Sequence, residues 1–133
     1  MSTGQYGPLN TKTWKAKRDL SSYQFHAVTL DTDGLVDYAD TSAGTIPLGI
    51  LQNKPSAANA EAEVALPGSV SLMVVNAGTD ISQMDKLGSG NDYHGAKVTA
   101  DKDLYGAIAL EDATDDGDTI EVLVVGPSYI SAT

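Results

Sequence analysis

Residues 24–39 read Gln-Phe-His-Ala-Val-Thr-Leu-Asp-Thr-Asp-Gly-Leu-Val-Asp-Tyr-Ala and set the pattern for the whole chain. In residues 24–30, side chains at every second position share a face, which is the period of a β-strand. The Asp-Thr-Asp-Gly that follows indicates a turn, because glycine adopts a positive φ at little cost. Residues 35–39 then return as the second arm of a predicted β-hairpin.

The rest of the chain repeats this alternation of short apolar runs with turn residues. Its 13 Gly and 14 Asp supply turns, and its Val, Ile and Thr supply β-branched strand residues. No window holds the apolar stripe of an amphipathic helix, so residues 111–116 are expected to form a single helical turn at most. About eight short strands predict one small, mainly β domain, a barrel or a sandwich. Beyond the hairpin, strands are expected over residues 46–51, 62–66, 69–75, 97–100, 104–110 and 119–125, and residues 81–87 are expected to form a further strand or a corner.

A faint internal echo accompanies these strands, at offsets of 57 or 58 residues. Two similar strand–loop–strand units would form pseudo-symmetric halves, although chance similarity between segments rich in Ala, Val and Gly explains the echo equally well. The first copies are Gly49-Ile-Leu51, Glu63-Val64 and Gly68, and the second copies are Gly106-Ala-Ile108, Glu121-Val122 and Gly126.

Charge is distributed unevenly along the chain. Residues 1–18 hold four basic residues and no acidic one, whereas the other four basic residues and all 18 acidic residues follow. We therefore expect a basic N-terminal arm over residues 1–19, a domain over residues 20–126 and a short tail over residues 127–133.

The arm shows neither strand nor helix period, and its Gly and Pro argue against independent folding. We expect it to be flexible until it orders on a partner. Its aromatic side chains would be the buried anchors and its cations the rim contacts, because apolar area usually outweighs exposed ion pairs. The candidate partner-binding residues are Tyr6, Lys12, Trp14, Lys15, Lys17 and Arg18.

The residues that usually carry chemistry form no motif. Cysteine is absent, which excludes disulfides, thiol nucleophiles and thiolate metal sites. His26 and His94 are far apart in sequence without a Gly-x-Ser-x-Gly elbow, and His26 is interpreted as a core or interface residue. A calcium loop starting at Asp112, in the acidic cluster of residues 111–121, would place Leu123 at the bidentate twelfth position. We expect no enzyme, no cofactor and no bound metal.

Nucleic acid and membrane are not expected partners. The net charge of −10 repels polyanions, and no nucleic-acid-binding motif or phosphate loop is present. No apolar stretch is long enough to span a bilayer, and the N-terminus lacks the apolar core of a secretory signal. Two classes of function stay open on these grounds: a structural interaction protein, and a small-ligand or calcium-binding β module.

Several segments, taken in their order and spacing, resemble a known family. They are Leu48-Gly-Ile-Leu-Gln-Asn-Lys-Pro55, Ala62-Glu-Val64, Pro67-Gly-Ser-Val70, Ala77-Gly78, Gly106-Ala-Ile-Ala-Leu-Glu-Asp-Ala113 and Ile120-Glu-Val-Leu-Val124. Over about residues 20–126 they are similar to the capsid cement, or head-decoration, proteins of tailed bacteriophages. The chain departs from that family at Met84-Asp85, where Gly-Asp is usual, and in its basic arm.

The resemblance implies a β-barrel or β-tulip domain without catalytic residues. It implies binding to the outer surface of the expanded head, with the major capsid protein and further copies of this chain, in a homotrimer, as partners. The protein would be made in the host cytoplasm and reside in the virion, where it bridges capsid subunits against the pressure of packed DNA. Many copies would multiply a modest local affinity.

Overall fold

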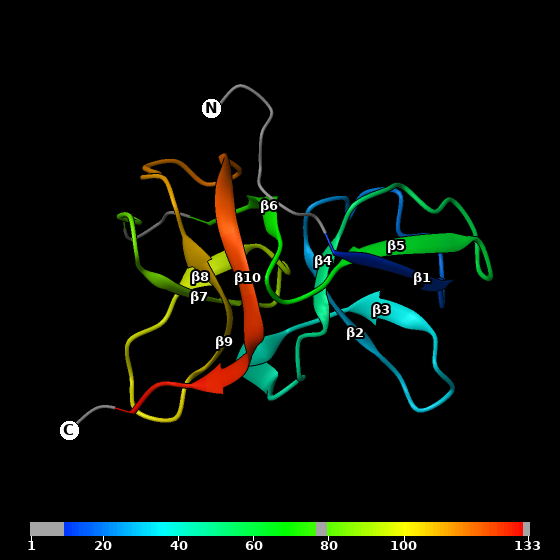
Figure 1. Ribbon diagram of the computed structural model, residues 1–133, viewed down its shortest axis with the longest axis horizontal. Coiled ribbons are helices and arrows are strands. Elements are labelled where there is room, and N and C mark those ends of the chain that lie inside the picture. The colour runs from blue at the N-terminus through cyan, green and yellow to red at the C-terminus, as the bar shows by residue number, and fades with distance from the viewer. Residues whose placement is uncertain (1–9, 77–79, 132–133) are drawn as a thin grey trace.

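The structure, a computed structural model, describes residues 10–76 and 80–131 and contains two antiparallel five-stranded sheets. The sheets lie side by side, the first on the right and the second on the left of Figure 1. In these residues the only helix is a 3-10 turn, η1 (Thr41–Ala43), and none could cross a membrane. The first sheet contains β1 (Thr11–Lys15), β2 (Ala27–Leu30), β3 (Val36–Tyr38), β4 (Gly49–Leu51) and β5 (Glu61–Ala65). The second contains β6 (Val70–Val74), β7 (Lys86–Ser89), β8 (Gly95–Lys97), β9 (Leu104–Ala109) and β10 (Thr119–Tyr129).

The two sheets have the same topology. The strand order is β1-β5-β4-β2-β3 in the first and β6-β10-β9-β7-β8 in the second, so each strand of the second sheet occupies the place of the strand five earlier. In each sheet a single parallel bridge links the segment after the first strand to an edge strand, Ala16 to Val36 and Val75 to Gly95. The chain therefore has two pseudo-symmetric halves, which decides between the two explanations of the sequence echo. We call residues 10–66 the first half and the described residues from 67 to 131 the second half.

The pairing registers identify corresponding residues in the two halves. Ile50 pairs with Ala65, and 58 residues later Ile108 pairs with Leu123. The match of Glu63-Val64 to Glu121-Val122 is therefore correct. The match of Gly49 to Gly106 is one residue out, because the register makes Ala107 the counterpart of Gly49.

The expected mainly β single domain is confirmed, with two changes in its architecture. The sheets are not closed into a barrel or tulip, because the single parallel bridge in each sheet is not a continuous ladder of paired residues. The arrangement is sandwich-like. Ten strands are present in the described residues where about eight were expected. Residues 111–116 contain turns and a bridge at Ala113 but no helical turn.

The expectation of a separate arm is wrong for residues 10–19. β1 pairs along its whole length with β5, and the side chains of Ala16 and Leu20 are fully buried. The strand was hidden because Thr-Lys-Thr-Trp-Lys carries only one apolar side chain and so shows no alternation. Residues 1–9, including Tyr6, lie outside the described residues. The expected tail also begins later than residue 127, because β10 continues to Tyr129 and pairs again with β9 after a register shift.

The halves form one unit because the larger core crosses between them. A smaller cluster fills the first half and includes Val28, Leu51 and Val64. The larger cluster fills the second half but also takes in Ala27, Ile50 and others from the first half. A buried polar link adds to it, because the hydroxyl of Thr41 donates to the carbonyl of Ser89 at 3.1 Å and accepts from the Ser89 amide at 2.7 Å.

Candidate functional site

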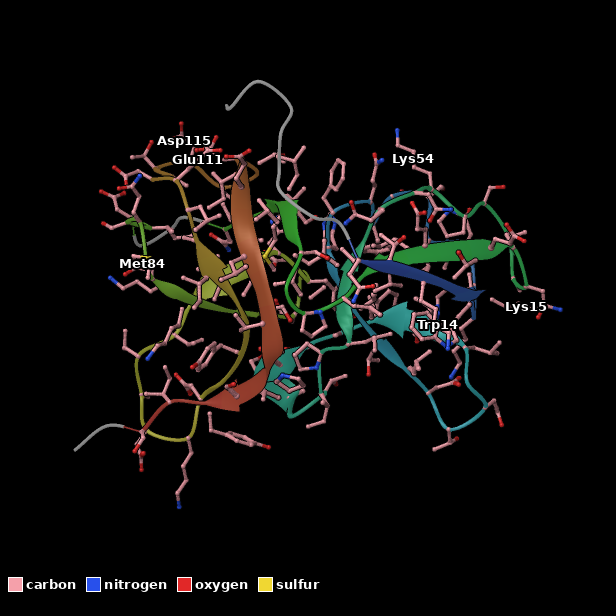
Figure 2. The ribbon with its side chains drawn as sticks, viewed as in Figure 1. Trp14, Lys15, Lys54, Met84, Glu111 and Asp115 are labelled. Carbon is pink, nitrogen blue, oxygen red and sulfur yellow. The ribbon has the colours of Figure 1, made fainter. Side chains whose placement is uncertain are left out.

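The predicted partner contacts lie along β1, at the edge of the first sheet. In the described residues no strand pairs with the outer side of β1. Lys12 and Lys15 are exposed there, and within the described residues neither forms an ion pair with a carboxylate. Lys15 lies at the right edge of the molecule in Figure 2, and Trp14 lies further inward on the same side. This edge offers unpaired main-chain groups and two free cations to a partner.

Trp14 has a role in the fold itself. Its half-buried ring packs against the first core, and Lys12 Nζ lies 5.3 Å from the ring centroid. Its counterpart in the second half is Met73, which is 2% exposed. Trp14 is therefore a core residue of its half whose remaining surface is open to a partner.

Lys17 and Arg18 are engaged within their own chain. Lys17 Nζ lies 3.2 Å from Oδ2 of Asp31, and Arg18 Nε lies 2.9 Å from Oδ1 of Asp37. Nη2 of Arg18 donates to Oδ2 of Asp37 at 3.0 Å. The charge of Asp37 raises the pKa of Arg18. These pairs fix the segment after β1 to the β2–β3 hairpin, which leaves the two β1 lysines as the available cations.

The fold also assembles an aromatic and histidine cluster that the sequence did not reveal. Tyr38 and Tyr93 stack across the two halves with centroids 4.1 Å apart, and Tyr23 packs edge-on against Tyr93 at 5.7 Å. The His26 and His94 rings, from different halves, are 5.1 Å apart. Burial lowers the pKa of His26. His26 is thus an interface histidine, as interpreted from its strand face.

Among the described residues, neither histidine is positioned to activate a nucleophile. Nδ1 of His26 donates to the Gln24 carbonyl at 3.0 Å, and Nδ1 of His94 lies 3.1 Å from Oδ1 of Asp116. No hydroxyl hydrogen-bonds to either ring there, so no Ser-His pair exists among these residues. The arrangement that could hold a metal ion comprises Asp92, His94 and Asp116.

A ligand-binding interior, which the alternative β module would need, is not supported by the space between the halves. The cavity there has a volume of about 10 Å³, which is about the space of one water molecule. An open apolar groove of about 330 Å³ lies on the surface instead. It is lined by Thr29, Leu30, Ile46, Pro47, Leu48, Pro67 and Pro127.

Comparison with known proteins gives a structural likeness. No protein-family model matches the sequence, and a search of curated proteins finds no match. The fold is similar to that of the crystal structure of the head fiber gp8.5 N base in bacteriophage phi29. The TM-score is 0.58 and the sequences are 20% identical, with 88% of this chain and 94% of that chain covered. The likeness therefore extends over both halves and shows a shared fold.

Proposed function

We propose that this chain is a structural, non-enzymatic protein of a bacteriophage head, and that it binds the outer capsid surface as a decoration protein. The observation that carries the proposal is the likeness to a head fiber base, which covers most of both chains. The segments that resemble cement proteins support it as well, since Leu48–Pro55 contains β4 and Gly106–Ala113 overlaps the end of β9, the corresponding strand of the second half.

The outer edge of β1 is the proposed contact with the major capsid protein. An extended segment of that protein would add a strand beside β1, with main-chain hydrogen bonds supplying affinity. Lys12 and Lys15 would steer the encounter with an acidic capsid surface, and the open face of Trp14 would supply apolar contact. Each exposed ion pair contributes about 0–1 kcal/mol, so tight decoration depends on the strand and on many copies acting together.

Copies of the chain would also contact one another, as a trimer on the capsid. Lys15 and the acidic residues Glu111 and Asp115 lie at opposite ends of the molecule (Figure 2). A head-to-tail ring of copies would bring these opposite charges together. Bridging of this kind is how a decoration protein would resist internal DNA pressure.

The test mixes purified protein with heads that lack it, at rising salt concentration. We expect saturable, stoichiometric binding that protects the heads from heat-induced DNA release. Lys12→Glu combined with Lys15→Glu should weaken binding at low salt, with a smaller difference at high salt. Lys54→Glu is the control away from the β1 edge, with half of the double variant's change in charge, since Lys54 is also exposed on the first half but lies away from β1 (Figure 2).

The outcomes separate the parts of this proposal. Absence of saturable binding to heads would contradict a head protein of any kind. Binding without protection would favour the anchoring role of a fiber base over cementing. A loss of binding free energy for Lys54→Glu that is at least half that of the β1 double variant would show that general charge, and not the β1 edge, is responsible.

A further inference from the structure

We propose that Asp92, His94 and Asp116 form a binding site for a divalent transition-metal ion of the zinc type. Bound there, the ion would join the loop between β7 and β8 to the loop between β9 and β10. This inference is separate from the proposed head function and does not depend on it.

The ligand atoms already have the spacing of a coordination shell. Nδ1 of His94 lies 3.1 Å from Oδ1 of Asp116 and 3.5 Å from Oδ2 of Asp92. Metal–ligand bonds of about 2.1 Å separate adjacent ligands by about 3.0 Å in an octahedron and about 3.4 Å in a tetrahedron. One donor atom from each of the three residues lies within 4.8 Å of the others. An ion bound between these side chains would replace the contact between Nδ1 of His94 and Oδ1 of Asp116.

The donor set selects the class of ion. One imidazole nitrogen with two carboxylate oxygens suits zinc and its neighbours, whereas calcium and magnesium prefer oxygen ligands alone. The side chains of Asp92 and Asp116 are 37% and 61% exposed, so the ion can enter from solvent. The remaining coordination positions face water.

A mostly buried imidazole also lies beside the cluster. His26 is only 6% exposed, and its ring packs 5.1 Å from that of His94. Because a carbonyl can only accept, Nδ1 of His26 carries the proton that binds Gln24, and Nε2 holds an unshared pair.

In the first half a lysine lies beside a turn carboxylate, and in the second half a neutral residue occupies the corresponding position. The turn carboxylate of Asp31 is neutralised by Lys17, which follows β1. The counterpart of Lys17 is Asn76, because both amides donate to the neighbouring edge strand at equivalent positions, Val36 and Gly95. Asn76 donates its neutral amide to Oδ2 of Asp92 at 3.2 Å. A metal ion would supply the positive charge that lysine supplies in the first half.

In the part of the chain that the structure describes, these two carboxylates, of Asp92 and Asp116, also have no lysine or arginine partner. Like charges this close repel each other, and a divalent ion converts that repulsion into attraction. The site thus has the geometry, the donors and the local charge that a cation requires.

The experiment uses the full chain, stripped with a chelator and titrated with Zn²⁺ by calorimetry, with Mg²⁺ and Ca²⁺ in parallel. We expect one saturable Zn²⁺ site per chain, a rise in melting temperature with Zn²⁺, and little response to Mg²⁺ or Ca²⁺. Co²⁺ substitution should give a visible absorption band that His94→Gln removes.

Variants locate the site. Asp116→Asn and His94→Gln should each weaken Zn²⁺ binding at least tenfold, the order of loss that even supporting groups of a metal site produce. Asp115→Asn is the matched control, because it removes the same charge from the neighbouring exposed residue. Far-ultraviolet circular dichroism confirms that each variant is folded, and Asp116 is exposed enough for its substitution to be tolerated.

Three results would overturn the inference. One is the absence of saturable Zn²⁺ binding by the full chain. Another is equal weakening by Asp115→Asn and Asp116→Asn, which indicates a diffuse acidic surface. The third is a Zn²⁺-induced melting shift in His94→Gln as large as in the parent chain. Head binding is not measured here, so failure of either proposal leaves the other intact.

Discussion

The first and second halves share one strand order and fill it with different side chains. The first half closes around a small core and carries five basic and seven acidic residues between positions 10 and 66. The second half has a longer last strand, a core that takes residues from its neighbour, and three basic against eleven acidic residues between positions 67 and 131. The topology fixes where strands lie, while the residues at corresponding positions decide what each half can bind.

Single positions show this division clearly. Gly49 in β4 corresponds to Ala107 in β9, and Trp14 in β1 corresponds to Met73 in β6. The second half accommodates the methyl group of Ala107, whereas the first half has room only for Gly49 at that position. The half-buried indole of Trp14 in the first half lies where the second half has the buried thioether of Met73. Substitutions at such pairs test how far the two halves are equivalent.

The largest difference is expected at Gly49. A Cβ there would lie 2.0 Å from the carbonyl oxygen of Ala65 and 2.9 Å from Cγ1 of Val64, so the backbone of β5 would have to move. Gly49→Ala should lower the free energy of unfolding by about 3 kcal/mol or more, above the usual overpacking cost. The measurement is urea denaturation followed by circular dichroism.

The matched change in the other half is Ala107→Gly. It removes a buried methyl group and loosens a strand, so it should cost about 1–2 kcal/mol. Equal losses for Gly49→Ala and Ala107→Gly would mean that the approach of β5 to Gly49 is not as close as the structure shows.

An intermediate difference is expected at the two corresponding isoleucines. Ile50 is 2% exposed and belongs to the core that joins the halves, whereas Ile108 is half-buried. Ile50→Ala should cost about 2–5 kcal/mol, and Ile108→Ala less than about 2 kcal/mol. Thermal unfolding monitored by two probes would also show whether the halves still unfold together. The reverse order of losses would contradict a core centred between the halves.

The smallest effect is expected at the turn carboxylate of the first half. Oδ1 of Asp31 accepts from the amides of Asp33 and Leu35, both at 2.9 Å, and Oδ2 faces Lys17. The Leu35 hydrogen bond, followed by Lys17, holds the pKa of Asp31 below its ordinary value despite desolvation. A lowered pKa stabilises the fold above the unfolded value of about 3.9, and this contribution is lost as pH falls through the folded value.

Asp31→Asn should therefore lower the melting temperature at pH 7, and the difference from the parent chain should shrink below about pH 4. Asp33→Asn removes the same charge from an exposed position in the same turn and should change the melting temperature less. A melting difference for Asp31→Asn that stays constant from pH 7 to pH 2 would show that the ionised carboxylate contributes nothing.

The sequence could predict most of the second half's strands and little of its site. Residues 69–75 and 119–125 alternate apolar and polar side chains, so their strands were evident, and β6 and β10 lie within or across these ranges. β8 lies earlier in the chain than the predicted strand, because Gly-Ala-Lys is short and has no apolar period. β1 was not predicted, because its lysines obscure any alternation of apolar and polar side chains. A local sequence pattern predicts a strand only where successive side chains alternate between apolar and polar.

The candidate sites depend on pairings that no local pattern encodes. Lys12 and Lys15 could be recognised as cations from sequence, but the engagement of Arg18 by Asp37 follows from how β3 lies beside the segment after β1. His94 and Asp116 come from different loops, and only the order of the second sheet brings them together. Residue types were therefore predictable, and their neighbours were not.

The pairing of first strand with last in each half has a consequence for synthesis on the ribosome. Thr11 pairs with Ala65, so β1 emerges early and stays without its partner until β5 has been translated. Lysines on such an unpaired edge discourage pairing with other nascent chains. The apolar side chains of Ala27 and Ile50 stay uncovered longer, because the core that buries them includes Val122 and Val124 of β10. Release of the C-terminal strand from the ribosomal tunnel is then the event that completes the fold, and its timing sets how long a chaperone-accessible surface persists.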